Sequence, residues 1–175
     1  IPRVENIDNK SIELGGIGLE TKYLFSSKYI VVFQHPETTS TLHPRDQIIM
    51  PIDAVEKLNY PTLWIWPNAD KGGDDFIREI SRAREIGKLK KVHFERSIEP
   101  EYFLSILKDT SCIIGNSSVA LRECSLIGIP SVNIGGRQAE RERAKNVIDV
   151  KFDSKAIYEA AIIQIAQNRF LPSNL

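Results

Sequence analysis

Cysteine and methionine are scarce in this chain, and neither sign of charge is in excess. Among 175 residues there are two cysteines and one methionine, and 23 Lys and Arg balance 23 Asp and Glu. A balanced charge excludes the broad basic field that attracts nucleic acid and the polybasic tract that attracts a membrane surface. Any anionic ligand must therefore be held by local geometry.

Several kinds of protein are excluded by further absences. Cys112 and Cys124 lack the spacing of metal ligands, which predicts buried thiols in a reducing compartment and neither a disulfide framework nor a metal site. The N-terminus has no apolar signal segment, and no run approaches the roughly 20 apolar residues that cross a bilayer. We therefore expect a cytoplasmic protein. The chain opens without Met, so we expect a fragment of something longer.

Known phosphate-binding and metal-binding signatures are also missing. There is no Gly-x-x-x-x-Gly-Lys-Ser/Thr loop, so phosphoryl transfer by a P-loop is not expected. The glycines of residues 15–18 are too isolated for a dinucleotide fingerprint, and we interpret residues 1–28 as a lead-in segment with a loop or linker there. Asp70 and the Asp74-Asp75 pair read as loop and helix-cap acids.

The rest of the sequence alternates between two periodicities. Short runs of β-branched and aromatic residues predict strands at residues 29–34, 62–66, 90–95, 111–115, 130–135 and 146–150. Amphipathic stretches predict helices at 45–59, 74–87, 99–109, 118–128 and 154–170. Pro44 and Pro100 suit first helical turns, Gly87 and Gly128 suit helix ends, and Pro51 should delay or kink the first helix. The pattern predicts one α/β domain over residues 1–175 with a doubly wound, mainly parallel sheet of about six strands.

A doubly wound sheet also predicts where a ligand binds. Its strands follow the order 3-2-1-4-5-6 in chain numbering, with one switch point between the first and fourth strands. The loops diverge there and leave a crevice at the carboxyl ends of the strands. Residues 34–39 follow the first strand, residues 115–118 follow the fourth, and residues 135–137 end the fifth beside them.

Four polar residues in or just after these loops suit a nucleoside diphosphate. Ser117 and Ser118 stand at the expected N-terminus of helix 118–128, where free N–H groups and the helix dipole favour an anion. Arg137 follows two glycines and can pair with a phosphate. Glu123 repels a phosphate but can accept hydrogen bonds from a neighbouring sugar diol.

Ser118, Glu123 and the neighbouring His35 also have alternative, structural roles. Ser118 is equally well explained as a helix N-cap, and Glu123 with Arg122 as an exposed or interface ion pair. His35 is by default a strand-end histidine satisfied by the backbone. We assign no chemistry to the two other histidines, His43 at a helix start and His93 within a strand.

Four motifs, taken together in their order along the chain, resemble the C-terminal half of the UDP-N-acetylglucosamine 2-epimerases. The resemblance rests on "CIIGNSSVALRE" (112–123), "GIPSVNIGGRQAERERAKNVIDV" (128–150), "QHPETT" (34–39) and "PNAD" (67–70), and it covers most of residues 29–150. "GNSS" followed by "RE" is closer to the hydrolysing branch, which makes N-acetylmannosamine or a related sugar for sialic-acid-type pathways. The non-hydrolysing branch carries an Asp-Ser-Gly-Gly turn instead.

The resemblance implies a two-domain enzyme of the glycosyltransferase-B type, with the UDP-sugar held between two Rossmann-like domains. This chain would be the C-terminal, nucleotide-sugar-binding domain. Carried over to this sequence, Ser117, Ser118 and Arg137 contact the diphosphate, and Glu123 holds the uridine ribose.

A base pocket and a catalytic histidine are implied as well. Ile98 and Phe103 align with positions that line the uracil pocket, although Phe103 is equally a core-facing position of helix 99–109. Glu99-Pro100 replaces the Pro-Phe of the family, so this edge of the pocket departs from the pattern. His35 matches a histidine near the pyrophosphate and the reacting sugar, where it donates to the diphosphate or takes part in proton transfer.

The family's reaction, as the resemblance implies it, removes the C2 proton, expels UDP to give a 2-acetamidoglycal and adds water with inversion at C2. The acids that move the proton lie in the family's N-terminal domain, so we expect this chain to bind UDP-N-acetylglucosamine without turning it over. No cofactor is expected, and the full-length protein should be a homo-oligomer. Two alternatives stay open: the donor-binding domain of a nucleotide-sugar-dependent glycosyltransferase, and a non-catalytic nucleotide-sugar sensor.

Overall fold

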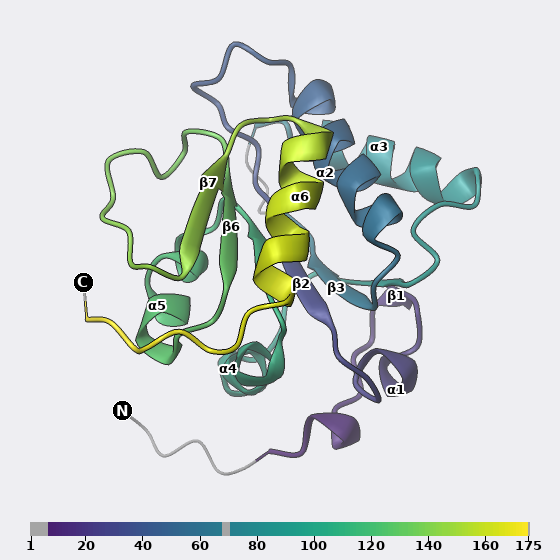
Figure 1. The fold of residues 1–175 in the computed structure, drawn as a ribbon. Helices are drawn as coiled ribbons and strands as arrows, with labels where there is room; N and C mark the ends of the chain where they lie inside the picture. Colours follow the sequence, from purple (N-terminus) through teal and green to yellow (C-terminus); the bar gives the residue numbers. More distant parts are fainter. Residues whose placement is uncertain (1–6, 68–70, 175) are drawn as a thin grey trace.

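A seven-stranded, mainly parallel sheet forms the centre of the computed structural model, which describes residues 7–67 and 71–174 (Figure 1). Its order is β1-β4-β3-β2-β5-β6-β7. The strands are β1 (Ile17–Gly18), β2 (Ile30–Phe33), β3 (Thr62–Ile65), β4 (Val92–Glu95), β5 (Ile113–Gly115), β6 (Ser131–Ile134) and β7 (Val147–Val150). β1 is antiparallel to β4, and the other neighbours are parallel. The α/β class, the six expected strands and their 3-2-1-4-5-6 order are confirmed.

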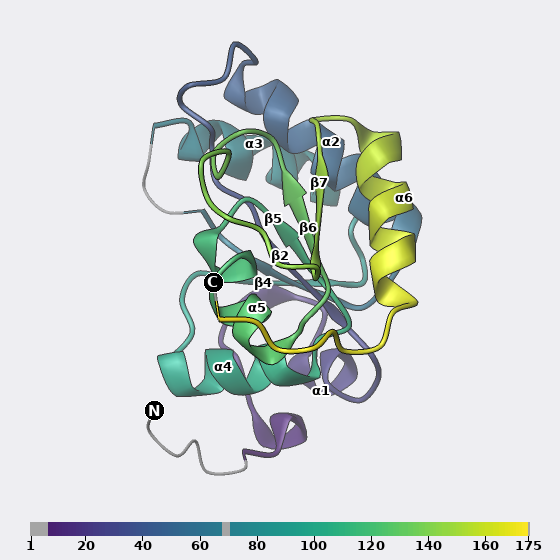
Figure 2. The same cartoon turned by 60° about the vertical axis from the view of Figure 1, so that its left-hand side comes forward.

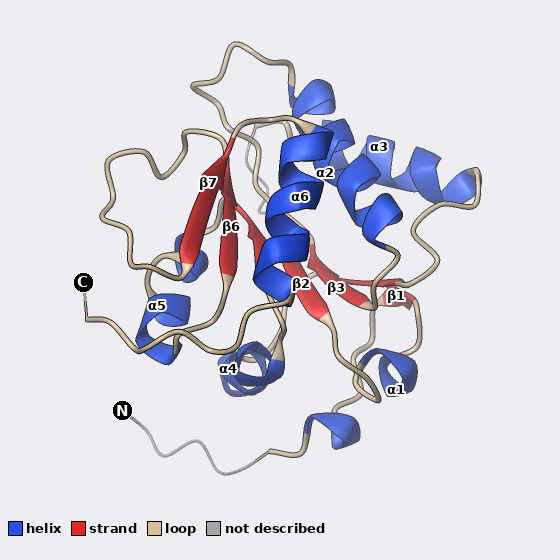
Figure 3. Ribbon diagram, in the orientation of Figure 1, coloured by secondary structure: helices blue, strands red, loops and turns tan. Residues whose placement is uncertain are grey.

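Helices cover both faces of this sheet (Figure 2, Figure 3). They are the 3₁₀ helices η1 (Asn9–Ser11) and η2 (Ser118–Ala120), and α1 (Thr21–Leu24), α2 (Pro44–Leu58), α3 (Gly73–Glu85), α4 (Pro100–Asp109), α5 (Glu123–Ile127) and α6 (Ser154–Ile165). On one face, α2, α3 and α6 bury the apolar side chains of Ile48, Phe76 and Ile157. On the other face, α1, α4 and α5 bury those of Leu24, Ile106 and Cys124.

The central strands are buried on both faces. In β2, Ile30 and Val32 belong to the core under α2, α3 and α6, and Val31 belongs to the core on the opposite face. Because successive side chains of a strand point to opposite faces, a continuous apolar run suits a strand that is covered on both sides. Each such side chain contributes about 1.5–3 kcal/mol when fully buried, so these runs stabilise the centre of the sheet.

The lead-in segment is more ordered than the sequence suggests. Ile17–Gly18 forms β1 and pairs with β4, so the expectation of a loop or linker is wrong at these two residues. The glycines allow this close approach, because a Cβ on Gly16 would lie 1.9 Å from the carbonyl oxygen of Phe94. Gly18 also has a φ of +100°, which favours glycine.

The expected helix over residues 118–128 is divided into η2 and α5. Two serine hydroxyls explain the division, because they donate to main-chain carbonyls that a continuous helix would use. Ser125 Oγ donates to Leu121 O at 2.7 Å, and Ser131 Oγ donates to Ala120 O at 3.4 Å. Side-chain bonds of this kind compete with the helical ladder. Glu123 is consequently the first residue of α5, not a residue one to two turns into a helix.

The start of α2 follows its sequence signals. His43 is the N-cap and its Nδ1 accepts a hydrogen bond from Arg45 N at 3.1 Å, while Pro44 occupies the first turn. Pro51 lies inside α2 and does not delay its start.

The third histidine, His93, is also structural, because its Nδ1 lies 2.7 Å from the main-chain oxygen of Leu19.

The last helix ends earlier than its apolar pattern suggests. α6 stops at Ile165, and the chain then runs back along the sheet, where Phe170 N donates to Gly128 O at 2.8 Å. A Cβ on Gly128 would lie 1.9 Å from Phe170 O, so a glycine is needed at this crossing.

Residues 68–70, which carry most of the "PNAD" motif and the expected loop acid Asp70, lie outside the described residues.

Gly115 at the end of β5 provides a first test of the fold. Its φ is +146° and a Cβ there would lie 2.0 Å from Phe33 O, whereas a Cβ on Gly15 would meet nothing within 4 Å. Gly115→Ala should lower the free energy of unfolding by about 1–3 kcal/mol or more, because strain adds to the clash. Gly15→Ala should change it by less than about 0.5 kcal/mol. Urea unfolding followed by circular dichroism measures both, and equal effects would contradict the β2–β5 geometry.

The two cysteines provide a second test. Both thiols are free and buried, and burial, together with the charge of Glu123, raises the pKa of Cys124 to about 12. Because the folded state disfavours the thiolate, the contribution of the neutral Cys124 thiol to the unfolding free energy is fully present below the unfolded pKa of about 8.5. That contribution is lost as pH rises from there towards the pKa of the thiol in the folded state. Between about pH 8 and pH 10, the unfolding free energy of Cys124→Ala should therefore fall less steeply than that of the unchanged chain. Parallel slopes would show that Cys124 ionises equally well in the folded state.

Candidate functional site

Three loops meet at the carboxyl ends of β2, β5 and β6. Phe33 at the end of β2 pairs with Gly115 at the end of β5, and Gly115 pairs in turn with Asn133 near the end of β6. Because these strands are parallel neighbours, their following loops emerge side by side. The switch point is therefore where the sequence placed it, and it brings together residues 34–39, 115–118 and 135–137.

Asn116 joins all three loops. Its side-chain Oδ1 accepts from His35 N at 2.7 Å, and its Nδ2 donates to His35 O at 2.8 Å. Its main-chain oxygen accepts from Arg137 Nη1 at 3.3 Å and from Gln138 Nε2 at 3.0 Å. Asn116 is fully buried. Asn116 was not predicted as a site residue, although its position beside the serine pair of "GNSS" was a usable signal.

Glu37 forms a second connection between the same loops. Its carboxylate accepts from Gly136 N at 3.1 and 3.2 Å, and the Glu37 main chain exchanges two hydrogen bonds with the Gln47 side chain. A Cβ on Gly135 would lie 2.5 Å from Glu37 Oε2. The two glycines therefore let the loop after β6 approach a buried carboxylate. This role was not apparent from the sequence.

Three rings contact one another in series: Phe103 on α4, Phe33 at the end of β2, and His35. The buried His35 ring lies with its centroid 4.6 Å from that of Phe33, and the Phe33 centroid is 6.3 Å from that of Phe103 in an edge-on arrangement. Phe103 is half-buried and packs against the core on that face of the sheet. His35 and Phe103 thus belong to one side of the crevice.

Ile98 lies farther along this edge. It is half-buried, packs against the same core and lines a cavity of about 360 Å³ together with Glu99 and Tyr102. Glu99 and Pro100 begin α4 here, so the departure from the family's Pro-Phe pattern falls on the wall of this cavity. Phe103 is absent from that wall among the described residues.

The serine pair occupies a tight turn and not the start of a long helix. Ser117 is buried and is the N-cap of η2, where its Oγ accepts from Val119 N at 3.4 Å. Ser118 is the first residue of η2 and is half-buried. The N-cap role therefore falls to Ser117, and the expectation that a long helix would add its dipole at Ser118 is wrong.

Glu123 points one carboxylate oxygen into the protein. Its Oε2 is buried and accepts no hydrogen bond from any described residue. No ion pair joins it to Arg122, which is exposed, within the part of the chain that the structure describes. The alternative of an ion pair with Arg122 within the chain is thus not seen. A buried acceptor without a donor costs about 1–3 kcal/mol, so Glu123 would be stabilised by a donor that the described residues do not supply.

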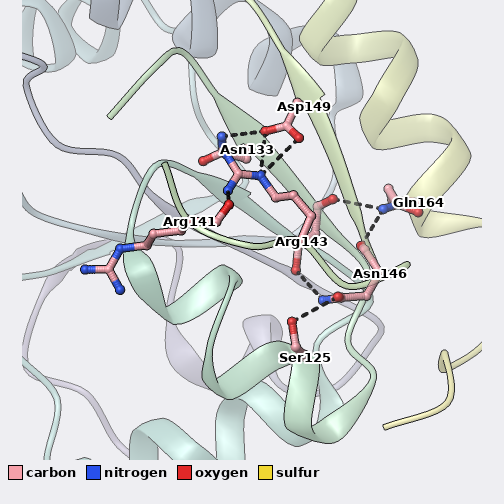
Figure 4. Close-up of polar contacts among 8 residues, drawn as sticks. Ser125, Asn133, Arg141, Arg143, Asn146, Asp149 and Gln164 are labelled. Atoms are coloured by element: carbon pink, nitrogen blue, oxygen red, sulfur yellow. Dashed lines mark hydrogen bonds and ion pairs between the residues drawn. The ribbon is translucent and has the colours of Figure 1, made fainter. Parts of the chain in front are cut away.

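The far end of the loop after β6 is held by a separate polar network (Figure 4). Arg143 Nε pairs with both oxygens of Asp149 at 3.1 and 3.2 Å, and Asn133 Nδ2 donates to Asp149 Oδ1 at 2.8 Å. Arg143 also donates to the main-chain oxygen of Arg141. These bonds tie the loop to β6 and β7.

Asn146 completes this anchoring. Its Nδ2 donates to Ile129 O at 2.9 Å, its Oδ1 accepts from Ser125 Oγ at 3.1 Å, and its main-chain oxygen accepts from Gln164 Nε2 at 2.8 Å. The motif "GGRQAERERAKNV" therefore has two parts with different structural roles. Its first residues reach the crevice, and its last residues hold the loop in place.

A family model described as UDP-N-acetylglucosamine 2-epimerase matches residues 4–172. This chain belongs to that family. It is 36% identical over 153 residues to the polysialic acid biosynthesis protein P7 of Escherichia coli, covering 86% of this chain and 38% of that protein. It is 32% identical over 132 residues to the UDP-N-acetylglucosamine 2-epimerase of Neisseria meningitidis serogroup B, covering 75% of this chain and 34% of the relative.

Solved structures agree on the fold. The UDP-GlcNAc 2-epimerase of Methanocaldococcus jannaschii, in complex with UDP-GlcNAc and UDP, superposes with a TM-score of 0.59 at 12% identity, covering 82% of this chain and 40% of that one. The chain therefore has the fold of one half of a glycosyltransferase-B type epimerase, and it spans well under half the length of these relatives.

Two further features bear on the kind of site. In the described part of the chain, no helix is long and apolar enough to cross a membrane. The described residues also contain no group of three or more His, Cys, Asp or Glu side chains placed to hold a metal ion. Asp74 and Asp75 lie in the first turn of α3, where acids suit the helix dipole, but the N-cap is Gly72 and no described side chain caps this helix end.

Proposed function

We propose that this chain is the UDP-binding domain of a UDP-N-acetylglucosamine 2-epimerase of the hydrolysing branch. In the proposed reaction UDP is eliminated to leave a 2-acetamidoglycal, and water then adds to give N-acetylmannosamine or a related sugar. Family membership and the "GNSS" turn support this assignment. The observation that carries it is the buried, unpartnered carboxylate oxygen of Glu123 close in sequence to the serine turn.

The diphosphate lies, in this proposal, between the serine turn and Arg137. The Arg137 side chain is exposed, and one of its nitrogens donates to Asn116 O. A guanidinium has five N–H donors in a planar fork, so this bond orients the group while leaving donors for a phosphate. The hydroxyls of Ser117 and Ser118 supply further donors.

The ribose diol donates to Glu123. A carboxylate accepts hydrogen bonds and offers none, which suits two vicinal hydroxyls. Because Glu123 Oε2 is buried, this contact requires the side chain to turn towards the ligand, and pairing with a hydroxyl then removes the cost of an unsatisfied buried acceptor. The uracil then extends towards α4, where the cavity lined by Ile98 and the neighbouring ring of Phe103 form the proposed base site.

His35 is the proposed catalytic residue. Elimination is feasible only when the charge that develops on UDP is stabilised, and fixed donors stabilise such charge most effectively. The serine turn and Arg137 supply the donors, and His35 donates to the diphosphate or takes part in proton transfer.

The acids that remove the C2 proton are proposed to come from outside this chain. Two carboxylates of this chain, Glu37 and Glu123, are the candidates for this step, and each has another role. Glu37 accepts from Gly136 N, and Glu123 is assigned to the ribose. The catalytic unit would therefore need the second domain of the epimerase architecture, and the complete enzyme is proposed to be a homo-oligomer.

Binding and turnover can be separated experimentally. The chain should bind UDP and UDP-N-acetylglucosamine, but more weakly than a complete two-domain enzyme, because one wall of the cleft cannot exclude water. Incubation with UDP-N-acetylglucosamine, followed by chromatography for UDP and N-acetylmannosamine, should show no release. Release at enzymatic rates would place the acids within this chain. Absence of UDP binding at millimolar concentration would overturn the nucleotide site.

Glu123→Ala should distinguish the ribose site from the phosphate site. It removes the diol acceptor and leaves the serine turn, so UDP should bind roughly ten- to a hundredfold more weakly while pyrophosphate is unaffected. Isothermal titration calorimetry with both ligands measures this. Arg137→Lys is the matched comparison and should weaken both ligands, because a flexible ammonium does not reproduce the planar fork. Equal losses for UDP and pyrophosphate in Glu123→Ala would remove Glu123 from the ribose role.

A further inference from the structure

We propose that Asn116 is a positioning residue that fixes His35 and Arg137 relative to each other, so that both act on the diphosphate from one arrangement. This inference rests on the proposed function. Asn116 connects the two groups by different parts of the same residue. Its side chain binds the main chain at His35, and its main-chain oxygen binds the side chain of Arg137.

The side-chain half of this connection needs an amide. Asn116 Oδ1 accepts from His35 N at 2.7 Å while Nδ2 donates to His35 O at 2.8 Å, so donor and acceptor are both used on one residue. An aspartate in place of Asn116 would lose the donor and set a negative oxygen against the carbonyl of His35. Because Asn116 is fully buried, water cannot replace either bond.

The main-chain oxygen of Asn116 orients the guanidinium of Arg137. Asn116 O accepts from Arg137 Nη1 at 3.3 Å and from Gln138 Nε2 at 3.0 Å, and Asn116 N donates to Phe33 O at 3.3 Å. The main chain at Asn116 is thus held by β2 and by the side-chain amide at His35, and it carries the acceptor for Arg137. Removing the amide frees the peptide to shift, and the acceptor for Arg137 then shifts with it.

The energetic consequence follows from preorganisation. Donors that are fixed before the leaving group develops charge need no reorganisation during the reaction, and misplacement by about 1 Å costs on the order of a hundredfold. Asn116→Ala should therefore remove much of the contribution of Arg137 to UDP binding without touching Arg137 itself.

A double-mutant cycle tests this on the chain as it is. UDP affinity is measured by calorimetry for the unchanged chain, Asn116→Ala, Arg137→Ala and the double variant. Asn116→Ala alone should weaken UDP by about tenfold, and in the double variant it should add only the smaller loss that acts through His35, so that the combined loss is clearly less than multiplicative. Multiplicative losses would overturn the inference, because they would mean that Asn116 acts independently of Arg137.

Asn9→Ala provides the matched control. Asn9 is also a buried asparagine, and it bonds Ser105 O at 3.1 Å and Asp109 Oδ2 at 2.7 Å, on α4 and away from the three loops. Its effect on UDP affinity should multiply with that of Arg137→Ala. Thermal melts establish which variants are folded at the temperature of the titration. If Asn116→Ala is not folded, Asn116→Ser, which keeps a hydroxyl, should show the same loss of additivity.

The His35 imidazole gives a second, independent readout. In nitrogen-resolved NMR, UDP should shift the His35 ring signals in the unchanged chain and in Asn9→Ala, and should shift them much less in Asn116→Ala. Equal shifts in all three would overturn the positioning role. Failure of the unchanged chain to bind UDP, or full UDP affinity in Arg137→Ala, would instead overturn the proposed function, or Arg137's place in it, on which this inference rests.

Discussion

The parallel pairing of β2 with β5 is the constraint on which the candidate site depends. From β2 the chain continues through α2 on one face of the sheet, and from β5 it continues through η2 and α5 on the other. Two neighbouring strands whose connections leave in opposite directions must open a crevice between their loops. Gly115 allows the pairing to reach this edge, because any Cβ there would collide with the main chain at Phe33. Asn116, the next residue, is then delivered to the place where it bonds both neighbouring loops.

The same geometry supports the proposal that a chain with no net charge holds a diphosphate. In the proposed site Arg137 is accompanied by two carboxylates, Glu37 and Glu123, so bulk electrostatics would not favour a diphosphate. One carboxylate, Glu37, is engaged by Gly136 N, and the other, Glu123, is directed into the protein. Separate directions keep the carboxylates from cancelling Arg137. Selectivity in such a site comes from the placement of donors and acceptors and not from the total charge.

The predicted and unpredicted elements differ in how far apart their causes lie in sequence. The six strands from β2 to β7 were predictable because apolar runs bounded by turn residues reflect burial on both faces. The division of helix 118–128 was not, because one of the hydroxyls responsible belongs to Ser131 on the next strand. β1 was missed for the same reason, since the strand with which it pairs, β4, lies far along the chain.

Local pattern was thus sufficient for the class of fold, the strand order, the switch point and the set of loops that face it. It was also sufficient to indicate the family, because the motifs occur in a fixed order along the chain. Tertiary structure alone revealed that Asn116 and Glu37 hold the loops together, that Ser117 caps the turn in place of Ser118, and that one oxygen of Glu123 is buried without a donor among the described residues. The bonds of Asn116 and Glu37 join segments that only the folded sheet brings within hydrogen-bonding distance, and a pattern read along one segment carries no information about the partner that will lie opposite it.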